Sequence, residues 1–240
     1  MTPKQLLFYS VYFSLWIQLI TGMVQIHGIL IEIDKGDFVL KEILILETIV
    51  QFIEAAFYVY IAFALTGINI SSVTPRRYFD WVITTPVMLI TTILFMEYDK
   101  KESFSNKEDD TEKEDLRLMS FVKENKDDII KIVVFNFLML MFGYLGEINV
   151  INKFIGVPIG FVFFFLSFEI IYRKYAFTQK TNRTNKILFI FLISIWSLYG
   201  VAAVFPALQK NLGYNVLDIL SKNFYGLYIY YRILKLKNYL

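Results

Sequence analysis

The sequence predicts an all-α membrane protein, a bundle of seven transmembrane helices. Two features of the composition indicate the membrane: 56% of the 240 residues are hydrophobic, and the mean hydropathy is +0.51. The third observation is that apolar runs of about 20 residues, the length that crosses a bilayer, recur along the chain. They fall at 5–26, 42–66, 76–98, 129–149, 154–173, 186–206 and 213–234.

Polar and turn-forming segments separate these runs, so we treat residues 1–240 as a single seven-helix domain. The first run follows one lysine, Lys4, and is too long and aromatic for a cleaved signal sequence, so we expect a retained helix. Segment 99–128 is the one soluble-looking part, a charged loop with a short helix expected near 116–122. Its acidic run 108–115 is explained more simply as a solvated loop than as a site for a divalent ion or a partner.

The distribution of Lys and Arg predicts the orientation of the bundle. With the N-terminus outside, the cytoplasmic segments hold 17 of these residues and the outer segments hold five. Because positive charges gather on the cytoplasmic side, we expect the N-terminus outside and the C-terminus in the cytoplasm. The absence of cysteine excludes disulfides and thiolate metal sites, and a single histidine gives no metal cluster.

A lysine, Lys222, stands in the middle of the seventh apolar run. Burying an ammonium in the hydrocarbon of a bilayer costs at least a few kcal/mol of free energy unless the group has a counter-charge or is modified. Asp218 lies one helical turn earlier on the same face, so the two are expected to be a cation and its counterion.

The third run carries a second buried charge. Asp80, Thr84 and Thr91 fall on one helix face, because spacings of four and seven return to nearly the same angle. Arg76 is explained as an interfacial charge where the helix begins. That explanation is weaker for Arg77 and Asp80, because an apolar run follows Asp80 directly.

These two motifs together resemble those of the microbial (type I) rhodopsins. The third run reads Arg77-Tyr78-x-Asp80-Trp81-x-x-Thr84-Thr85-Pro86 and the seventh Asp218-x-x-x-Lys222, and the resemblance covers all seven spans. It implies that Lys222 carries all-trans retinal as a protonated Schiff base, with Asp80 and Asp218 as counterions, and that the protein is not an enzyme. By position it also implies a set of residues that surround the retinal: Tyr58, Trp81, Thr84, Thr85, Met88, Met139, Gly143, Trp196 and Tyr199.

The chain departs from the family pattern at four positions. Gly200 stands where the sixth helix usually has proline, and Ala203 replaces a second tryptophan, so the far end of the pocket is expected to be looser. Thr91 replaces the carboxylate that reprotonates the Schiff base in bacterial-type proton pumps, and Lys210 falls near their outer glutamate.

The second run adds acidic residues of its own. Glu47, Gln51 and Glu54 share one helix face, and two glutamates are costly toward lipid, so we expect this face to line a polar path inside the bundle. The pattern resembles channelrhodopsins, in which a second-helix glutamate bonds to the asparagine after the retinal lysine, here Asn223. It also resembles the rhodopsins of large algal viruses.

We therefore expect a light-gated cation channel, with Glu47 as the inner constriction, Arg77 as the outer one, and Glu54, Asn223, Gln51 and Thr91 along the path. The alternative is an outward proton pump in which Glu47 is the proton donor on the cytoplasmic side. A sensory photoreceptor comes third, and a transporter or receptor without retinal last. The expected partners are the lipid bilayer and monovalent cations or protons, in the plasma membrane of a host cell and without nucleic acid. A homo-oligomer is left open.

Overall fold

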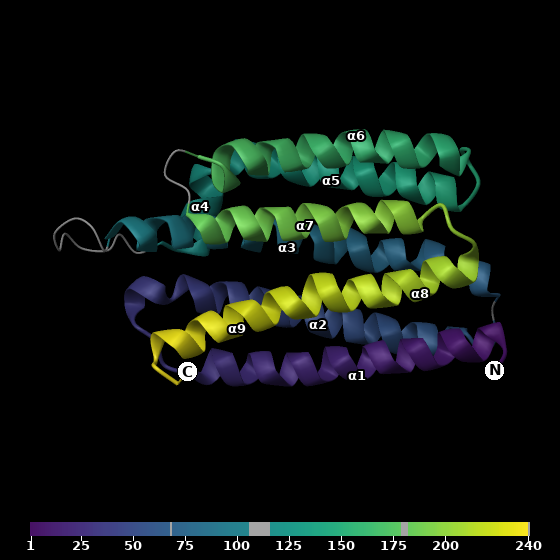
Figure 1. Ribbon diagram of the computed structural model, residues 1–240, viewed down its shortest axis with the longest axis horizontal. Helices are drawn as coiled ribbons and strands as arrows, with labels where there is room; N and C mark the ends of the chain where they lie inside the picture. The colour runs from purple at the N-terminus through teal and green to yellow at the C-terminus, as the bar shows by residue number, and fades with distance from the viewer. Residues whose placement is uncertain (68, 106–115, 179–181, 240) are drawn as a thin grey trace.

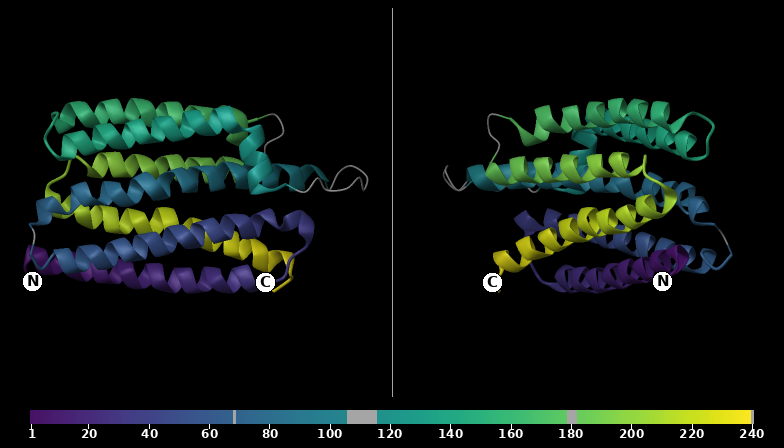
Figure 2. Two further views of the ribbon diagram at one scale, coloured as in Figure 1. Left: turned by 180° about the vertical axis from the view of Figure 1, so that it is seen from behind. Right: turned by 45° about the vertical axis from the view of Figure 1, so that its right-hand side comes forward.

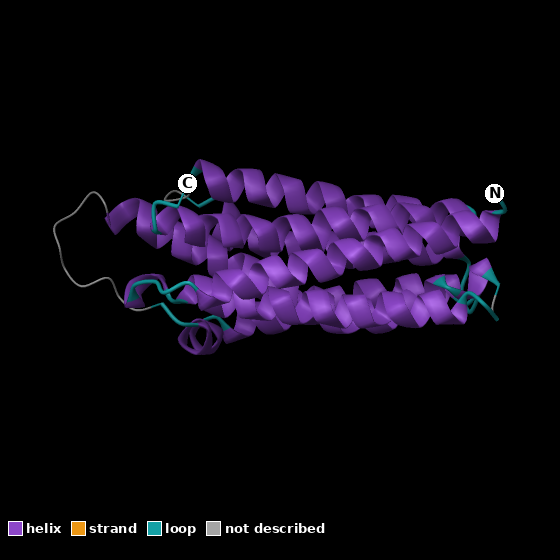
Figure 3. Cartoon of the chain, turned by 90° about the horizontal axis from the view of Figure 1, so that it is seen from below, coloured by secondary structure: helices purple, strands orange, loops and turns teal. Residues whose placement is uncertain are grey.

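All regular elements that the structure describes are helices (Figure 3). The computed structural model describes residues 1–67, 69–105, 116–178 and 182–239. The long helices are α1 (Pro3–Leu30), α2 (Val39–Ala64), α3 (Thr74–Ser105), α5 (Lys126–Glu147), α6 (Lys153–Ile171) and α7 (Arg183–Ala202). The seventh span consists of α8 (Ala207–Asp218), η4 (Ile219–Asn223) and α9 (Phe224–Leu236), and the short elements are η1 (Lys35–Asp37), η2 (Ile70–Ser72), α4 (Leu118–Glu124) and η3 (Tyr172–Ala176).

The spans run side by side as one elongated bundle. Helices α5 and α6 pair along one side, α3 and α7 lie in the middle, and α1, α2 and the seventh span form the other side (Figures 1 and 2). The two termini lie at opposite ends, which we call the N-terminal and C-terminal ends of the bundle. This arrangement agrees with the predicted seven-helix membrane fold.

Within the described residues, six helical spans are long and apolar enough to cross a membrane. The seventh is interrupted, because Ile219–Asn223 forms one π-helical turn between two α-helical pieces. Such turns are frequent at functional sites, and this one contains Lys222.

The segment predicted as a charged loop, 99–128, is shorter in the structure. Helix α3 continues to Ser105, α5 begins at Lys126, and the expected short helix is present as α4. Helix α4 is tied to α2, since the Leu118 backbone N–H donates to Glu42 across 2.8 Å. The whole acidic run, 108–115, lies outside the described residues.

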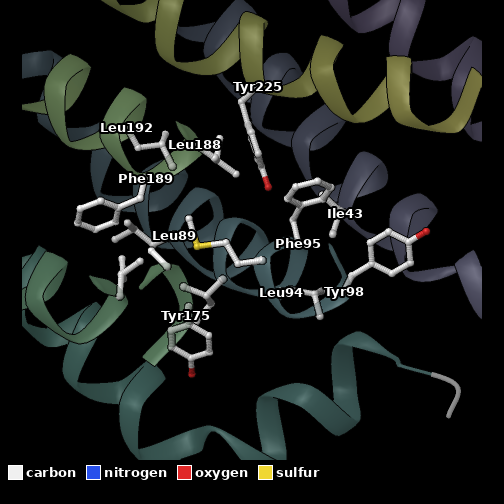
Figure 4. Packing of buried hydrophobic residues seen from close by; sticks show 14 of the residues in the cluster. Ile43, Leu89, Leu94, Phe95, Tyr98, Tyr175, Leu188, Phe189, Leu192 and Tyr225 are labelled. Carbon is white, nitrogen blue, oxygen red and sulfur yellow. The ribbon is translucent and has the colours of Figure 1, made fainter. Parts of the chain in front are cut away.

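The interior of the bundle is apolar toward one end and charged in the middle. Toward the C-terminal end of the bundle lies an apolar core in which Ile43 of α2, Phe95 of α3 and Tyr225 of α9 meet (Figure 4). The middle of the bundle instead buries charged side chains. Large apolar residues such as Phe13, Trp16 and Phe63 are more than half exposed, as expected for helices that face lipid.

Candidate functional site

Lys222 is buried at the centre of the bundle among three carboxylates. Its Nζ lies 2.8 Å from Asp80 Oδ2, 3.0 Å from Glu54 Oε1 and 3.9 Å from Asp218 Oδ1. The π turn carries Lys222, the last residue of α8 is Asp218, α3 carries Asp80, and α2 carries Glu54. The sequence predicted two of these carboxylates as counterions, and the structure adds the third.

The burial of these charges is tolerable only because they are paired. Each of the four side chains is at most 3% exposed. Removing one partner of a buried pair typically costs about 3–5 kcal/mol, because the other charge is left uncompensated. The cluster therefore ties α2, α3 and the seventh span together at one height of the bundle.

Arg77 closes the cluster on the side of the N-terminal end. Its guanidinium donates to Asp218 across 3.0 Å, and its Nε donates to Asn211 across 3.1 Å. A further bond joins the guanidinium to Asn215. Arg77 thus binds Asp218, and among the described residues it makes no hydrogen bond to Asp80.

Two tyrosine hydroxyls complete the surroundings of Asp218. Tyr58 and Tyr199 each donate to one of its carboxylate oxygens across 2.8 Å. Asp218 is therefore fully engaged, whereas Asp80 Oδ1 has no hydrogen-bond partner among the described residues. Of the two aspartates, Asp80 has the freer oxygen and lies closer to Lys222.

A mostly apolar cavity extends from Lys222 between α3, α5, α6 and α7. Seven of the residues predicted to surround the retinal line it: Trp81, Thr85, Met88, Met139, Gly143, Trp196 and Tyr199. A primary amine at one end of an aromatic, apolar cavity suits a long polyene aldehyde, which could bond to the amine and bury its chain. The residues present therefore fit retinal, and the Lys222 ammonium carries the positive charge that a protonated Schiff base would have.

Two residues predicted for this set do not line the cavity. Tyr58 lies on the other side of the charge cluster, where its hydroxyl binds Asp218. The Thr84 hydroxyl donates to the Asp80 backbone carbonyl across 3.0 Å, one turn earlier in the same helix, so it lies beside the charge cluster. The expected looseness near Gly200 is reduced, because the Phe161 ring occupies the space that a side chain would take.

The polar face of α2 points into the bundle, as predicted. Glu47, Gln51 and Glu54 are 0% exposed and form a row that leads from Lys222 toward the C-terminal end. Glu47 accepts a hydrogen bond from the Thr91 hydroxyl across 2.6 Å. The Glu47 carboxylate thus lies beside Thr91, the α3 position at which this sequence has threonine in place of a carboxylate.

Helix α1 presents a matching row that the sequence reading missed. Gln18, Thr21 and Gln25 are at most 4% exposed. Gly22 lies against the Phe52 ring and Gly28 against Leu44, and this antiparallel register places the three at the heights of Glu54, Gln51 and Glu47. Their spacing of three and four residues within an apolar run was the available signal.

Many polar atoms of these two rows and of the neighbouring π turn have no hydrogen-bond partner among the described residues. They include both side-chain polar atoms of Gln18, Gln25 and Gln51 in the rows and of Asn223 in the π turn. Buried polar groups are normally satisfied by protein or by ordered water, so these atoms are the ones that water between α1, α2 and the seventh span would satisfy.

The expected hydrogen bond between Glu54 and Asn223 is absent, which corrects the sequence-based prediction. Glu54 points to the Lys222 ammonium, because an opposite charge at 3.0 Å attracts a carboxylate more strongly than a neutral amide does. A second unpredicted pair joins Lys210 of α8 to Glu147 of α5 across 2.6 Å at the N-terminal end.

Comparison with known proteins identifies relatives along the whole chain. The family described as bacteriorhodopsin-like protein matches residues 10–236. The crystal structure of viral rhodopsin OLPVRII is 31% identical, with a TM-score of 0.80, over 96% of this chain and 98% of that one. No curated protein sequence matches.

Two more distant structures are similar in fold alone. Xanthorhodopsin, described as a light-driven ion pump with dual chromophore, is 18% identical with a TM-score of 0.72, over 98% of this chain and 94% of its own. The blue light-absorbing proteorhodopsin from Med12 is 17% identical with a TM-score of 0.69, over 96% and 98%.

Proposed function

Because the chain belongs to the bacteriorhodopsin-like family, the microbial rhodopsins, which bind retinal through a lysine, we propose that it is a light-gated cation channel with all-trans retinal on Lys222. The observation that supports a channel is the pair of polar rows on α1 and α2. They place buried polar side chains at successive heights from Lys222 to Glu47, well beyond what a counterion requires.

The charge cluster couples light to the path. Retinal supplies light absorption and a change of shape at the Lys222 nitrogen. Asp80 is the closest carboxylate to that nitrogen and has a free oxygen, so it accepts the proton. Once Lys222 loses its positive charge, Glu54 loses its attraction to it and is free to turn into the space between α1 and α2.

In the dark, the path is closed at its inner end. Glu47 is held by Thr91, and beyond it lies the apolar core that includes Leu40, Ile43 and Phe95. Ions cannot cross a dry apolar constriction, so opening requires these helices to separate. Arg77 with its partners forms the barrier at the other end.

The lining of the path predicts the permeant ion, and the distribution of Lys and Arg predicts the orientation of the protein in the membrane. Glu47 and Glu54 carry carboxylates and the α1 row carries carboxamide oxygens, all of which favour cations, so we propose monovalent cations or protons as the permeant ions. We place the N-terminal end outside and the C-terminal end in the cytoplasm of a host cell, in its plasma membrane, from the excess of Lys and Arg at the C-terminal end.

One observation favours a second function, an outward proton pump. Glu47 occupies the place beside Thr91 from which a donor could return a proton to the Lys222 nitrogen along the same row of polar groups. In that scheme the path carries only protons and never opens to both sides.

Voltage-clamp recording of the light-induced current separates the two functions. A channel current reverses sign with voltage, and its reversal potential follows the cation gradient. A pump current stays outward across the accessible range, and that result would refute the channel. Lys222→Ala, which cannot bind retinal, is the control and should give no photocurrent.

A further inference from the structure

Two neighbouring hollows at the N-terminal end of the bundle share Pro75 and Arg76. The first lies on the surface between α2 and α3, where Phe57, Tyr60 and Phe79 line it. The second lies where the connections between α2 and α3, α5 and α6, and α7 and α8 meet, on the right in Figure 1. Arg76 stands at the junction of the two.

The second hollow carries an excess of positive charge. Arg76, Lys153 and Lys210 line it together with one carboxylate, Glu147. Both Glu147 oxygens are taken by Lys210, at 2.6 and 2.8 Å. The hollow therefore has a net charge of about +2, because Glu147 compensates only one of its three cations.

Arg76 and Lys153 meet neutral acceptors only, within the part of the chain that the structure describes. Arg76 donates to the Tyr60 hydroxyl across 2.9 Å and to the Ser72 carbonyl, and Lys153 donates to the Val204 carbonyl across 3.2 Å. These bonds satisfy donors but leave the charges uncompensated. An anion in the hollow would be attracted by both.

The first hollow is apolar and faces the lipid. The Phe79 side chain is 64% exposed and Tyr60 is 49% exposed. A ligand with an anionic group and an apolar chain would match both hollows at once, whereas a free anion would match only the second.

We propose that this surface selects an anionic phospholipid from the outer leaflet of the membrane, in which such lipids are the minority. Its phosphate lies between Arg76 and Lys153, and an acyl chain lies against Phe57 and Phe79. A zwitterionic headgroup fits less well, because its own cation would meet the net positive charge of the hollow. Arg76 precedes Arg77, and Lys210 precedes Asn211, so the bound lipid would stabilise the end of the bundle that holds the barrier on Asp218.

Native mass spectrometry of the full-length pigment in detergent tests the proposal, with phosphatidylglycerol, phosphatidylcholine or inorganic phosphate added. We expect phosphatidylglycerol to bind and to raise the thermal unfolding midpoint, and the other two to do neither. Arg76→Gln with Lys153→Gln should weaken binding about 25-fold, or about fivefold per charge. Phe79→Ala should weaken it without changing any charge. Lys4→Gln removes an exposed positive charge at the same end outside the hollow and is the matched control.

Two results would overturn the proposal. The first is unchanged phosphatidylglycerol binding in the double variant, or in Lys153→Gln alone should the double variant fold poorly. The second is equal stabilisation by inorganic phosphate with no effect of Phe79→Ala, which would assign the hollow to a free anion.

Discussion

Thr91 donates its hydroxyl to Glu47 across 2.6 Å and so joins the middle of α3 to the middle of α2. Glu47→Gln keeps the shape of the side chain and removes its charge. In a channel we expect weaker cation selectivity, seen as a shifted reversal potential, while the pigment recovers its dark absorption at a nearly unchanged rate. In a pump the recovery should slow by about 100-fold, the usual contribution of a positioned proton donor. Flash spectroscopy together with voltage clamp measures both, and Thr91→Val, which keeps the Glu47 charge, is the control.

Replacing Lys222 should prevent pigment formation. Lys222→Ala removes the amine and leaves two buried carboxylates, Asp80 and Glu54, without their cation, so it should also destabilise the bundle by about 3–5 kcal/mol. Lys222→Arg keeps a positive charge but offers no primary amine. Absorption spectra after addition of all-trans retinal should show no pigment in either variant and a normal pigment in Lys131→Ala. A covalent pigment in Lys222→Arg would contradict the assignment.

The two aspartates should differ in their effect on colour. Asp80 lies 2.8 Å from Lys222 Nζ, whereas Asp218 lies at 3.9 Å and is already neutralised by Arg77. Asp80→Asn should therefore shift the absorption maximum to longer wavelength by more than Asp218→Asn does. The opposite order would make Asp218 the principal counterion.

Arg77→Gln should destabilise the protein much more than Arg76→Gln. Arg77 is 0% exposed and pairs with a buried carboxylate, so its loss should cost about 3–5 kcal/mol. Arg76 lies at the surface with neutral partners, and in lipid-free detergent its replacement should cost about 1 kcal/mol or less. Thermal unfolding of the two pigments gives the comparison, and equal midpoints would show that the Arg77 network is not stabilising.

Gly226 of α9 lies against the Gln25 amide. A side-chain carbon at position 226 would collide with that amide, which is the far end of a flexible side chain and can turn away. Gly226→Ala should therefore displace Gln25, cost about 1 kcal/mol, and change the photocurrent. Adding Gln25→Ala should restore stability, since it removes the colliding group. If the double variant is no more stable than Gly226→Ala, the α1 row does not pack as the structure shows.

Much of the fold was predictable because a bilayer imposes a simple rule on sequence. Each span must be apolar over about 20 residues, so all seven spans, including that of Lys222, can be located by counting. The helix ends were less predictable. Helix α3 continues to Ser105, since charged residues such as Lys101 and Glu102 remain helical once they leave the membrane.

The site residues divide in the same way. The motif around Asp80 and the pair Asp218 and Lys222 are local patterns, and the sequence alone determined that a buried cation lies near carboxylates in a seven-helix bundle. The sequence could not determine which acceptor each donor would choose. That choice depends on distances between helices far apart in the chain.

Only the tertiary structure decided that Glu54 turns to Lys222 and not to Asn223, that Arg77 binds Asp218, and that α1 faces α2 with a second polar row. The physical reason is that hydrophobic length is a property of one helix, whereas the partner of a buried charge depends on the register and rotation of several. Membrane insertion selects the first, and the pairing of charges in a medium of low dielectric constant selects the second.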